Sequence, residues 1–581
     1  MSRFSLSAAR AALAAVLCAG IPACGSDGPA GGNGVIAPES GDGQAGMVGT
    51  ALQPLVVRLM GPGGQPAAGV TVTWSLPGGR GTVAPATGLT DGGGRAQAVV
   101  TLDTVAGVYV VEARAPGFTG SPVRFTVTAL PGPPASLSRA AGDSQLGITA
   151  QAAQPFVVRV ADRYGNPVPG VPVDWQVTAG GGSFGTARTT TGATGLASNT
   201  LRLGDSSGVQ TATAAVAGLP PVPFTVTAYP PPRLLQSVPI PENYGIHDTF
   251  VRDGIAFVFA WNTGVIIYDV GNGAAGGTPA APVRVGGVVT QGGQAHNGWW
   301  FWNPNTGERR YLFVGEEGPG TLGASSSGDI HVVDVSDLAN PVEVASFHLP
   351  NAGTHNFWMD EAAEILYAAY YNGGVVALDV SGTLSGALET QGRLRAQARP
   401  GGAGSTYVWG VQLHNGSLYA SDMLTGLWQL DPATLATRGG GRNVAERYTS
   451  DLWVANGHAY TGTWGNRAAV GNALKVWRLQ PGGAPALVDS VITAGIGTVS
   501  DVEVSPNGKL LLASSERGPA AGIQFHRLDD PARPRFLTQV SVATGVHTAT
   551  FGEIGGRLYV FAARNPAGAA LLIYDVTGMA D

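Results

Sequence analysis

The sequence predicts an all-β protein in which two antiparallel sandwiches are followed by a seven-bladed propeller. The composition is the first indication: 88 glycines and 40 prolines among 581 residues, with only 12% charged side chains, favour short strands and tight turns over helices. The second indication is a pair of related segments 101 residues apart in the first half of the chain. The third is a shorter repeat, of roughly 50 residues, that runs through the second half.

Residues 1–23 have the layout of an export signal. Two arginines precede an apolar stretch that is shorter than the roughly 20 residues of a membrane-spanning helix. The stretch ends in "IPAC", which resembles a bacterial lipobox, and this resemblance implies cleavage before Cys24 and lipidation of its sulfur. The lipid would anchor the protein at the bacterial outer membrane or cell surface. A plain signal peptide with an incidental cysteine is the alternative.

Residues 24–49 are rich in Gly, Ser, Pro and Asp. Such a composition offers little apolar surface for a core. We therefore expect this segment to be a flexible tether.

Two consecutive domains are expected at 50–130 and 131–229. Leu55–Trp74 matches Phe156–Trp175, and both copies close with the identical segment "FTVTA". Alternating side chains in "GVTVTW" and "GVPVDW" are typical of strands with one buried face. We interpret Trp74 as a core residue, and its counterpart in the second copy likewise.

The pattern G-x-P-x-x-G-V-x-V-x-W, present in both copies, resembles the bacterial Ig-like domains of the invasin and intimin type. The resemblance implies two Ig-like β-sandwiches that act as rigid stalk segments, some of which end in adhesive tips. Neither copy shows a catalytic constellation.

Residues 233–581 are predicted to form the propeller. Seven units each contain a strand, a glycine-containing turn, a second apolar strand and a third strand such as "GVIIYDV" or "LLIYDV", which is typical of propeller blades. The last unit lacks a fourth strand, so we expect Leu234–Ile240 to pair with Leu571–Val576 and close the ring. The segment "HVVDVSDLANPVEVAS" resembles the LVIVD-repeat proteins, which implies a propeller in an exported or surface protein and no defined reaction.

Histidines recur at one position of the repeat, where the first strand begins. His247, His296, His355 and His547 occupy this position in four units, and the other three carry Trp409, Ser450 and Ser500. Because first strands surround a propeller axis, these histidines form a candidate rim for a ligand or metal. The candidate mouth residues around them are Asp248, Trp261, Glu316, Glu317, Tyr371, Trp409, Asp422, Trp464, Glu516 and Arg564.

Three interpretations of the histidines remain open at this point. Each ring could tie its own loop to the backbone, the rim could bind a ligand, or it could take part in catalysis. Because a ring of seven blades is wide, we expect only a neighbouring pair to meet, His247 with His547 or with His296. A carboxylate such as Glu316 or Glu516 would complete such a site. A divalent metal is compatible with this arrangement, and the sequence requires no cofactor.

The function predicted first is that of a lipid-anchored surface protein whose propeller binds a protein or carbohydrate ligand or mediates adhesion. A metal-assisted propeller enzyme that uses the histidine rim is the alternative. The net charge is only −6 and no run of Lys and Arg occurs, which argues against nucleic acid as a partner. H-E-x-x-H, P-loop and C-x-x-C motifs are absent from the sequence, so binding is favoured over catalysis. We expect a monomer.

Overall fold

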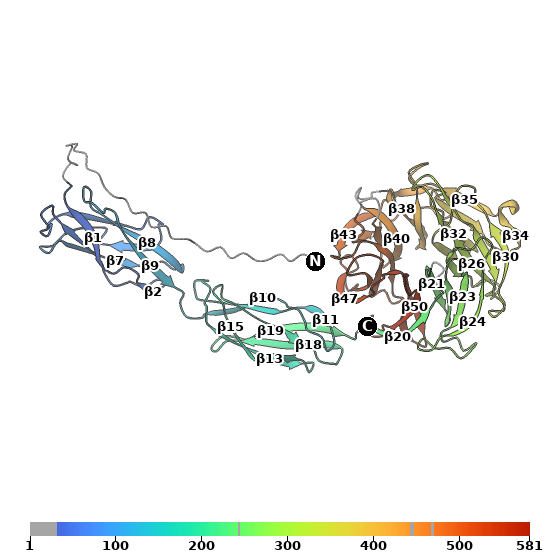
Figure 1. Cartoon of the computed structure of the whole chain (residues 1–581), viewed down its shortest axis with the longest axis horizontal. Coiled ribbons are helices and arrows are strands. Elements are labelled where there is room, and N and C mark those ends of the chain that lie inside the picture. The colour runs from blue at the N-terminus through green and yellow to red at the C-terminus, as the bar shows by residue number, and fades with distance from the viewer. Residues whose placement is uncertain (1–31, 242–244, 442–446, 466–469) are drawn as a thin grey trace, which may run out of the picture.

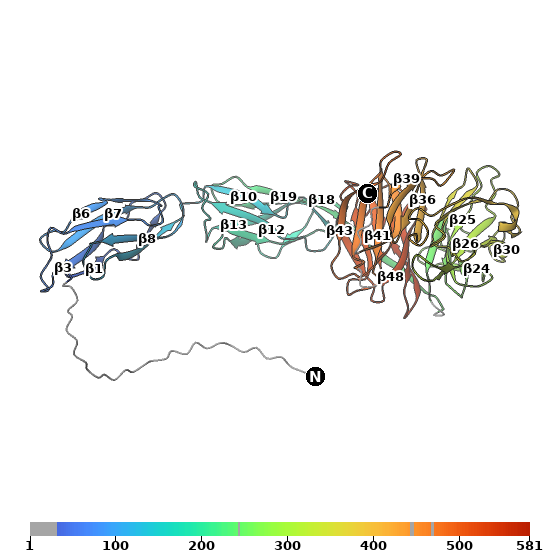
Figure 2. The same ribbon diagram turned by 90° about the horizontal axis from the view of Figure 1, so that it is seen from above.

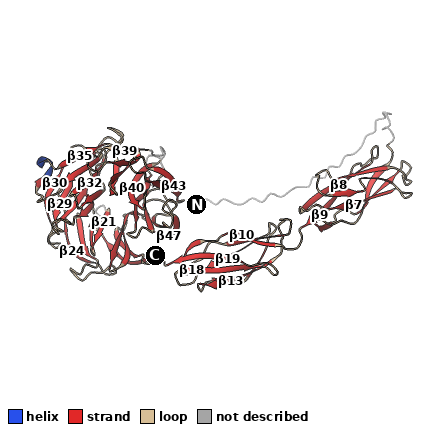
Figure 3. Ribbon diagram, turned by 180° about the vertical axis from the view of Figure 1, so that it is seen from behind, coloured by secondary structure: helices blue, strands red, loops and turns tan. Residues whose placement is uncertain are grey.

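Two β-sandwiches and a propeller follow one another in a row (Figures 1 and 2). The computed structural model describes residues 32–241, 245–441, 447–465 and 470–581. Within these ranges nearly all regular structure is strand, with a single 3₁₀ turn at η1 (Leu388–Gln391) (Figure 3). The predicted all-β fold class is confirmed. None of the helical structure in this part of the chain is long and apolar enough to cross a membrane.

The first sandwich packs a four-stranded sheet, in the order β1-β3-β7-β5, against a five-stranded sheet, in the order β2-β9-β8-β4-β6. Its core contains Trp74, 2% exposed and stacked on Phe125 at 5.9 Å, as the sequence predicts. The strands are β1 (Val35–Ser40), β2 (Ala45–Met47), β3 (Leu55–Met60), β4 (Thr71–Ser75), β5 (Thr82–Ala84), β6 (Thr87–Leu89), β7 (Arg95–Thr101), β8 (Gly107–Arg114) and β9 (Val123–Leu130).

The second sandwich repeats this plan, with the orders β10-β12-β16 and β11-β19-β18-β13-β15 and a small β14-β17 pair. Trp175 is 4% exposed in its core. The strands are β10 (Ser136–Ala141), β11 (Gln145–Ile148), β12 (Phe156–Ala161), β13 (Pro172–Ala179), β14 (Ser183–Phe184), β15 (Arg188–Thr190), β16 (Leu196–Asn199), β17 (Leu201–Arg202), β18 (Gly208–Ala215) and β19 (Val222–Tyr229).

The predicted tether at 24–49 is wrong for its second half, because β1 and β2 belong to the first sandwich. β1 pairs with β3 and buries Ile36, and β2 pairs in parallel with β9. The signal was present in the repeat: "GDGQ" at 41–44 matches "GDSQ" at 142–145. In both copies the aspartate accepts a backbone N–H from the last long strand, from Thr126 and Thr225 respectively.

The propeller consists of seven four-stranded blades, each antiparallel throughout its four main strands. The first strands are β21 (Asp248–Arg252), β25 (Ala295–Trp300), β31 (Phe357–Asp360), β36 (Val408–His414), β40 (Tyr448–Ala455), β44 (Val499–Val504) and β48 (Val546–Ile554). The second strands are β22 (Ile255–Phe259), β26 (Tyr311–Glu316), β32 (Ile365–Ala369), β37 (Ser417–Asp422), β41 (His458–Trp464), β45 (Leu510–Ser515) and β49 (Arg557–Arg564).

Third and fourth strands complete the blades toward the outside. The third strands are β23 (Val265–Asp269), β29 (Ile330–Asp334), β33 (Val375–Asp379), β38 (Gly426–Leu430), β42 (Ala473–Arg478), β46 (Gly522–Arg527) and β50 (Ala570–Asp575). The fourth strands are β24 (Val283–Val288), β30 (Val342–Phe347), β35 (Leu394–Ala398), β39 (Thr437–Gly440), β43 (Ala486–Ile492), β47 (Arg535–Ser541) and β20 (Arg233–Pro239). Three short strands, β27 (Gly318–Pro319), β28 (Ser326–Ser327) and β34 (Gly386–Ala387), lie in loops.

The ring closes as the sequence predicts. β20 pairs antiparallel with β50, so the seventh blade has the order β20-β50-β49-β48 and contains both ends of the propeller. Each first strand contacts the first strand of the next blade, and β48 contacts β21. The first strands therefore surround a common axis, where their side chains meet.

The second sandwich and the propeller share a hydrophobic core. Ile148 and Tyr229 of the sandwich are buried in one cluster with Val576 and Met579 of the seventh blade. Arg535 on β47 also donates a hydrogen bond to a backbone carbonyl of the sandwich, at 2.6 Å. The second sandwich thus joins the propeller through packed side chains and not only through the connecting segment.

Candidate functional site

The position predicted for the histidines coincides with irregular strand pairing. The register between first and second strands shifts at His296, at Trp409 and at the equivalent positions of the fifth, sixth and seventh blades, 450–451, 500–501 and 547–548. Such β-bulges insert an extra residue and redirect its side chain. The equivalence of these positions, inferred from the sequence, is therefore visible in the backbone.

All four histidines converge at the axis. The ring centroids of His247 lie 3.6 Å from His296, 4.0 Å from His547 and 6.4 Å from His355. His296 and His355 are separated by 4.3 Å. The expectation that only a neighbouring pair would meet is wrong, because the imidazole side chains are long enough to reach one another across the axis, two of them, His296 and His547, from β-bulges.

The ring nitrogens have the hydrogen-bonding pattern of metal ligands. Nδ1 of His355 donates to the backbone carbonyl of Trp409 at 2.7 Å, which leaves Nε2 unprotonated, buried and without a hydrogen-bond partner. His547 directs its Nδ1 at the carboxylate of Glu516. A backbone carbonyl or a carboxylate behind one nitrogen orients the ring and makes the other nitrogen a better ligand.

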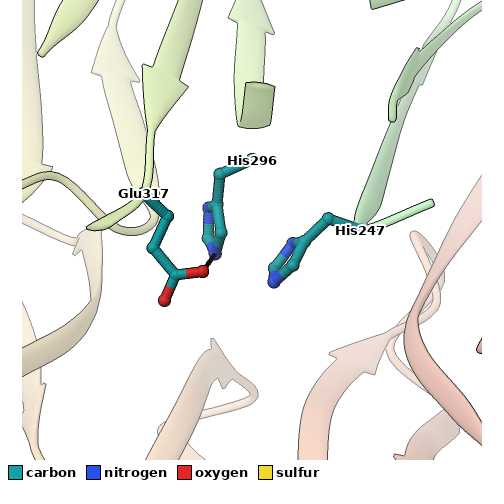
Figure 4. A group of neighbouring side chains, drawn as sticks. All are labelled: His247, His296 and Glu317. Atoms are coloured by element: carbon teal, nitrogen blue, oxygen red, sulfur yellow. Dashed lines mark ion pairs between the residues drawn. The ribbon is translucent and has the colours of Figure 1, made fainter. Parts of the chain in front are cut away.

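The two central histidines are less constrained. Both nitrogens of His296 and Nδ1 of His247 are buried without hydrogen-bond partners. Unsatisfied buried polar atoms are costly and point to an absent ion or ligand. Figure 4 shows these two rings side by side with the carboxylate of Glu317 next to His296.

Glu317 completes a three-residue group that could hold a metal ion together with His247 and His296. Its Oε2 lies 3.7 Å from Nε2 of His296, and its Oε1 accepts a hydrogen bond from the hydroxyl of Tyr371. Burial raises the pKa of Glu317 to about 7, against a smaller opposing effect of the Tyr371 hydrogen bond. A neighbouring cation would stabilise its ionised form.

Burial also keeps the imidazoles neutral. It lowers the pKa of His355 to about 3 and that of His547 to about 4. The pKa values of His247 and His296 fall well below the ordinary value, first because of burial and then because of the neighbouring histidines. Neutral imidazole is the form that binds metal.

Aromatic side chains enclose the cluster. Trp261 lies 4.9 Å from His247, Tyr371 and Trp409 lie 5.0 and 4.1 Å from His355, and Trp464 lies 6.2 Å from His547. Trp261 and Tyr371 adopt left-handed backbone conformations, with φ of 47° and 39°. Each of them pairs with the first strand of the next blade, at residues 295 and 408, which fixes these strained positions.

Six of the predicted mouth residues therefore meet the histidines, and the other four do not. Glu316 instead pairs with His331, at 3.4 Å. Asp422 accepts backbone N–H groups from Tyr407, Leu424 and Thr425. Arg564 lies against Gly568, and Asp248 faces an axial cavity further along the first strands. The six that meet the histidines are Trp261, Glu317, Tyr371, Trp409, Trp464 and Glu516.

Ser450 and Ser500, which occupy the histidine position in the fifth and sixth blades, have a structural role. Ser450 donates to the carbonyl of Val499 at 2.5 Å, and Ser500 contacts the carbonyl of Val546 at 3.4 Å. His355 makes the corresponding bond to Trp409 with one nitrogen only. The interpretation of the histidines as backbone ties thus applies to Nδ1 of His355, and its Nε2 is left over for a ligand.

Comparison with known proteins identifies the second sandwich. Residues 147–228 match the sequence model of the bacterial Ig-like domain (group 1) family. The D0-D1 domain of intimin is similar at 20% identity, covering 32% of this chain and 96% of that one, with a TM-score of 0.15. No curated protein sequence matches the chain.

Two solved propellers are also similar. The β-propeller domain of Cps50 (Swd1) from Myceliophteria thermophila has 10% identity and a TM-score of 0.43, covering 60% of this chain and all of that one. The WD40 β-propeller domain of Doa1 has 10% identity and a TM-score of 0.42, covering 59% of this chain and 96% of that one.

Proposed function

We propose that this chain is a surface-displayed protein whose propeller binds a first-row transition-metal ion at its axis. The observation that carries the proposal is the convergence of four buried, neutral imidazoles, three of which, His247, His296 and His355, have a ring nitrogen without a hydrogen-bond partner. Imidazole suits Zn²⁺, Cu²⁺, Fe²⁺ and Ni²⁺. His247, His296, His355 and His547 are the proposed ligands, and Glu317 is either a further ligand or a partner of His296.

Display at the surface is the second part of the proposal. It is supported by the Ig-like domain at 147–228 and by the two-sandwich stalk. The export signal and the lipobox with Cys24 lie outside the described residues and remain predictions. The outer-membrane location, which is inferred from them, also remains a prediction. Membership of the LVIVD-repeat proteins is a prediction as well. Binding of a protein or carbohydrate ligand by the head, with adhesion as the result, is likewise part of this proposal.

Metal analysis of the full chain tests the first part. We expect one transition-metal ion per chain after purification or after loading with Zn²⁺, and its loss in the His296→Gln variant. His348→Gln is the matched control, because the His348 side chain is 55% exposed and pairs with Asp329. Co²⁺ loading provides a second measurement, since its visible absorption reports nitrogen ligands.

An unchanged metal content in a folded His296→Gln variant would contradict the proposal. So would the absence of any ion after loading wild-type protein with each of the four metals. Circular dichroism of both variants establishes that the fold is retained.

Fractionation tests anchoring. Lipidated protein is expected to partition with detergent, whereas the Cys24→Ser variant is expected in the soluble fraction. Equal membrane retention of the two proteins would rule out lipid anchoring at Cys24.

A further inference from the structure

The propeller axis contains a second feature that the histidine cluster does not use. A cavity of about 220 Å³ is lined by residues from the first strands of all seven blades. Its aromatic residues lie three positions beyond the histidines, as Phe250 does relative to His247 and Trp299 relative to His296. At about 3.3 Å of rise per residue, these aromatic residues are about 10 Å further along the strands than the proposed metal ligands. The near end of the cavity, at Asp248, Asn297 and Asn356, begins directly beyond the histidines.

The wall of the cavity is an arc of aromatic side chains. Phe250 and Trp299 are separated by 5.3 Å between ring centroids, Trp299 and Trp358 by 5.2 Å, and Trp358 and Trp453 by 6.0 Å. All four are partly exposed despite their position inside the propeller. Large aromatic groups that are not buried against each other leave their faces available to a ligand.

Four carboxyl groups also line the cavity, among uncharged residues. Asp248, Asp451, Asp501 and Glu503 line the cavity, and none of the described lining residues is Lys or Arg. Backbone N–H groups of the seventh blade fix two of these side chains, Ala549 with Asp501 at 2.7 Å and Phe551 with Glu503 at 3.0 Å. Burial raises the pKa of all four carboxyl groups, to about 7 for Asp248 and to about 6 for Asp451. A cation bound in the cavity would favour their ionised forms.

Aromatic faces together with carboxylates match one class of ligand. The negative face of a π-system attracts a cation, and alkylated ammonium groups are bound in this way in aromatic cages. A hard metal ion would need six or more oxygen ligands, and the aromatic half of this wall offers none. A neutral apolar ligand would offer no opposite charge to the carboxyl groups.

We propose that the axial cavity binds a small organic cation that carries an alkylated ammonium group. The cation lies against the arc of Phe250, Trp299, Trp358 and Trp453 and close to the carboxyl groups that line the same cavity, of which Asp501 and Glu503 come from the sixth blade. This site is separate from the histidine cluster, so it does not depend on the metal proposal.

Calorimetric titration of the full chain with choline tests the proposal. We expect saturable binding at one site per chain. The neutral isostere 3,3-dimethylbutan-1-ol, which has the same shape without the charge, should bind at least about tenfold more weakly because it loses the cation–π attraction and the ionic attraction.

Variants locate the site. Glu503→Gln keeps the shape and the acceptor for the N–H of Phe551, and is expected to weaken choline binding about tenfold because the amide cannot ionise next to the bound cation. Trp358→Leu should weaken choline binding more than Glu503→Gln does, and Trp358→Phe should weaken it less than Trp358→Leu. The matched controls are Glu389→Gln and Phe536→Leu, which are remote from the cavity and should bind choline as wild type does.

Equal affinity for choline and its neutral isostere would overturn the proposal, as would unchanged binding by Glu503→Gln. Saturable binding of Ca²⁺ without binding of choline would replace it by an inorganic cation site. The His296→Gln variant should retain full choline binding, which separates this result from the outcome of the metal experiment.

Discussion

At the start of the first strands, one backbone position serves two purposes. Serine there bonds to the backbone of the next blade, as Ser450 does with Val499. Histidine is long enough to reach the axis, and His355 combines both functions because its two nitrogens face different partners. Side-chain length thus decides whether the residue at this position only bonds to the backbone or also reaches the axis as a possible metal ligand.

Tyr371 is predicted to position Glu317 for the metal. Its hydroxyl donates to Oε1 while Oε2 faces His296. We expect Tyr371→Phe to lower metal affinity by about 10- to 100-fold, as is typical when a residue behind a ligand is removed. Competition with a chelator measures this affinity. Unchanged affinity would show that the carboxylate needs no such support, and Tyr407→Phe, whose hydroxyl faces Gly320, is the control.

His526 is expected to make stability depend on pH. Burial lowers its pKa to about 4, so the folded state keeps it neutral where the unfolded chain, with a pKa near 6.5, binds a proton. The contribution of neutral His526 to the free energy of unfolding is therefore fully present above about pH 6.5, and it is lost as the pH falls toward 4.

Replacing His526 with Leu removes this dependence. From pH 7 to pH 5, the free energy of unfolding of the variant should improve by about 2 kcal/mol relative to wild type. Urea denaturation at the two pH values measures the difference. If the free energies of unfolding of the two proteins differ by the same amount at pH 7 and at pH 5, protonation of His526 is not the cause of the pH dependence.

At the scale of strands, repeats in the sequence were sufficient to predict most of the architecture. The third strands, the closing pair and the core tryptophans follow from period and alternation. Glu316 and Glu317 show where this reasoning ends: neighbouring residues of a strand face opposite sides, and the exact strand end decides which one meets the axis. Convergence of the histidines depends on where each side chain points at the start of its strand, with β-bulges at His296 and His547, and the sequence pattern does not reveal these details.

The closing strand β20 is expected to be essential for the propeller. Replacing Arg233–Pro239 with a Gly/Ser segment of equal length would remove its pairing with β50 and expose two strand edges. We expect the thermal midpoint of the propeller to fall by at least about 5 °C and soluble aggregates to form. Calorimetry and light scattering measure these effects. The same replacement at residues 24–30 should leave the propeller unchanged.

At the scale of the whole molecule, the shared core makes the second sandwich and the propeller one mechanical unit. Arg527 connects them further: its guanidinium lies 4.7 Å from the ring of Tyr229, and it donates to the carbonyl of Met579 at 2.8 Å. The two sandwiches meet more lightly, through Asn166, which bonds to backbone groups of residues 104 and 106. Bending is therefore expected between the sandwiches rather than at the head.

Calorimetry tests this division. We expect Tyr229→Ser to lower the unfolding temperature of the propeller as well as that of the second sandwich, because the substitution opens a core that both share. Tyr164→Ser, at a residue that is 41% exposed, is the control and should change neither. A shift confined to the sandwich transition would show that the two parts unfold independently.

The pairing of β20 with β50 also imposes an order in time. A chain synthesised from its N-terminus presents β20 at the beginning of the propeller segment and β50 at the end of that segment, so the ring stays open until the last blade has been made. Contacts between such distant segments are slow to form, and unpaired edges attract other chains while they wait. The already folded Ig-like sandwich beside β20 would then serve as a fixed starting point, against which the final strand docks once the last blade has been synthesised.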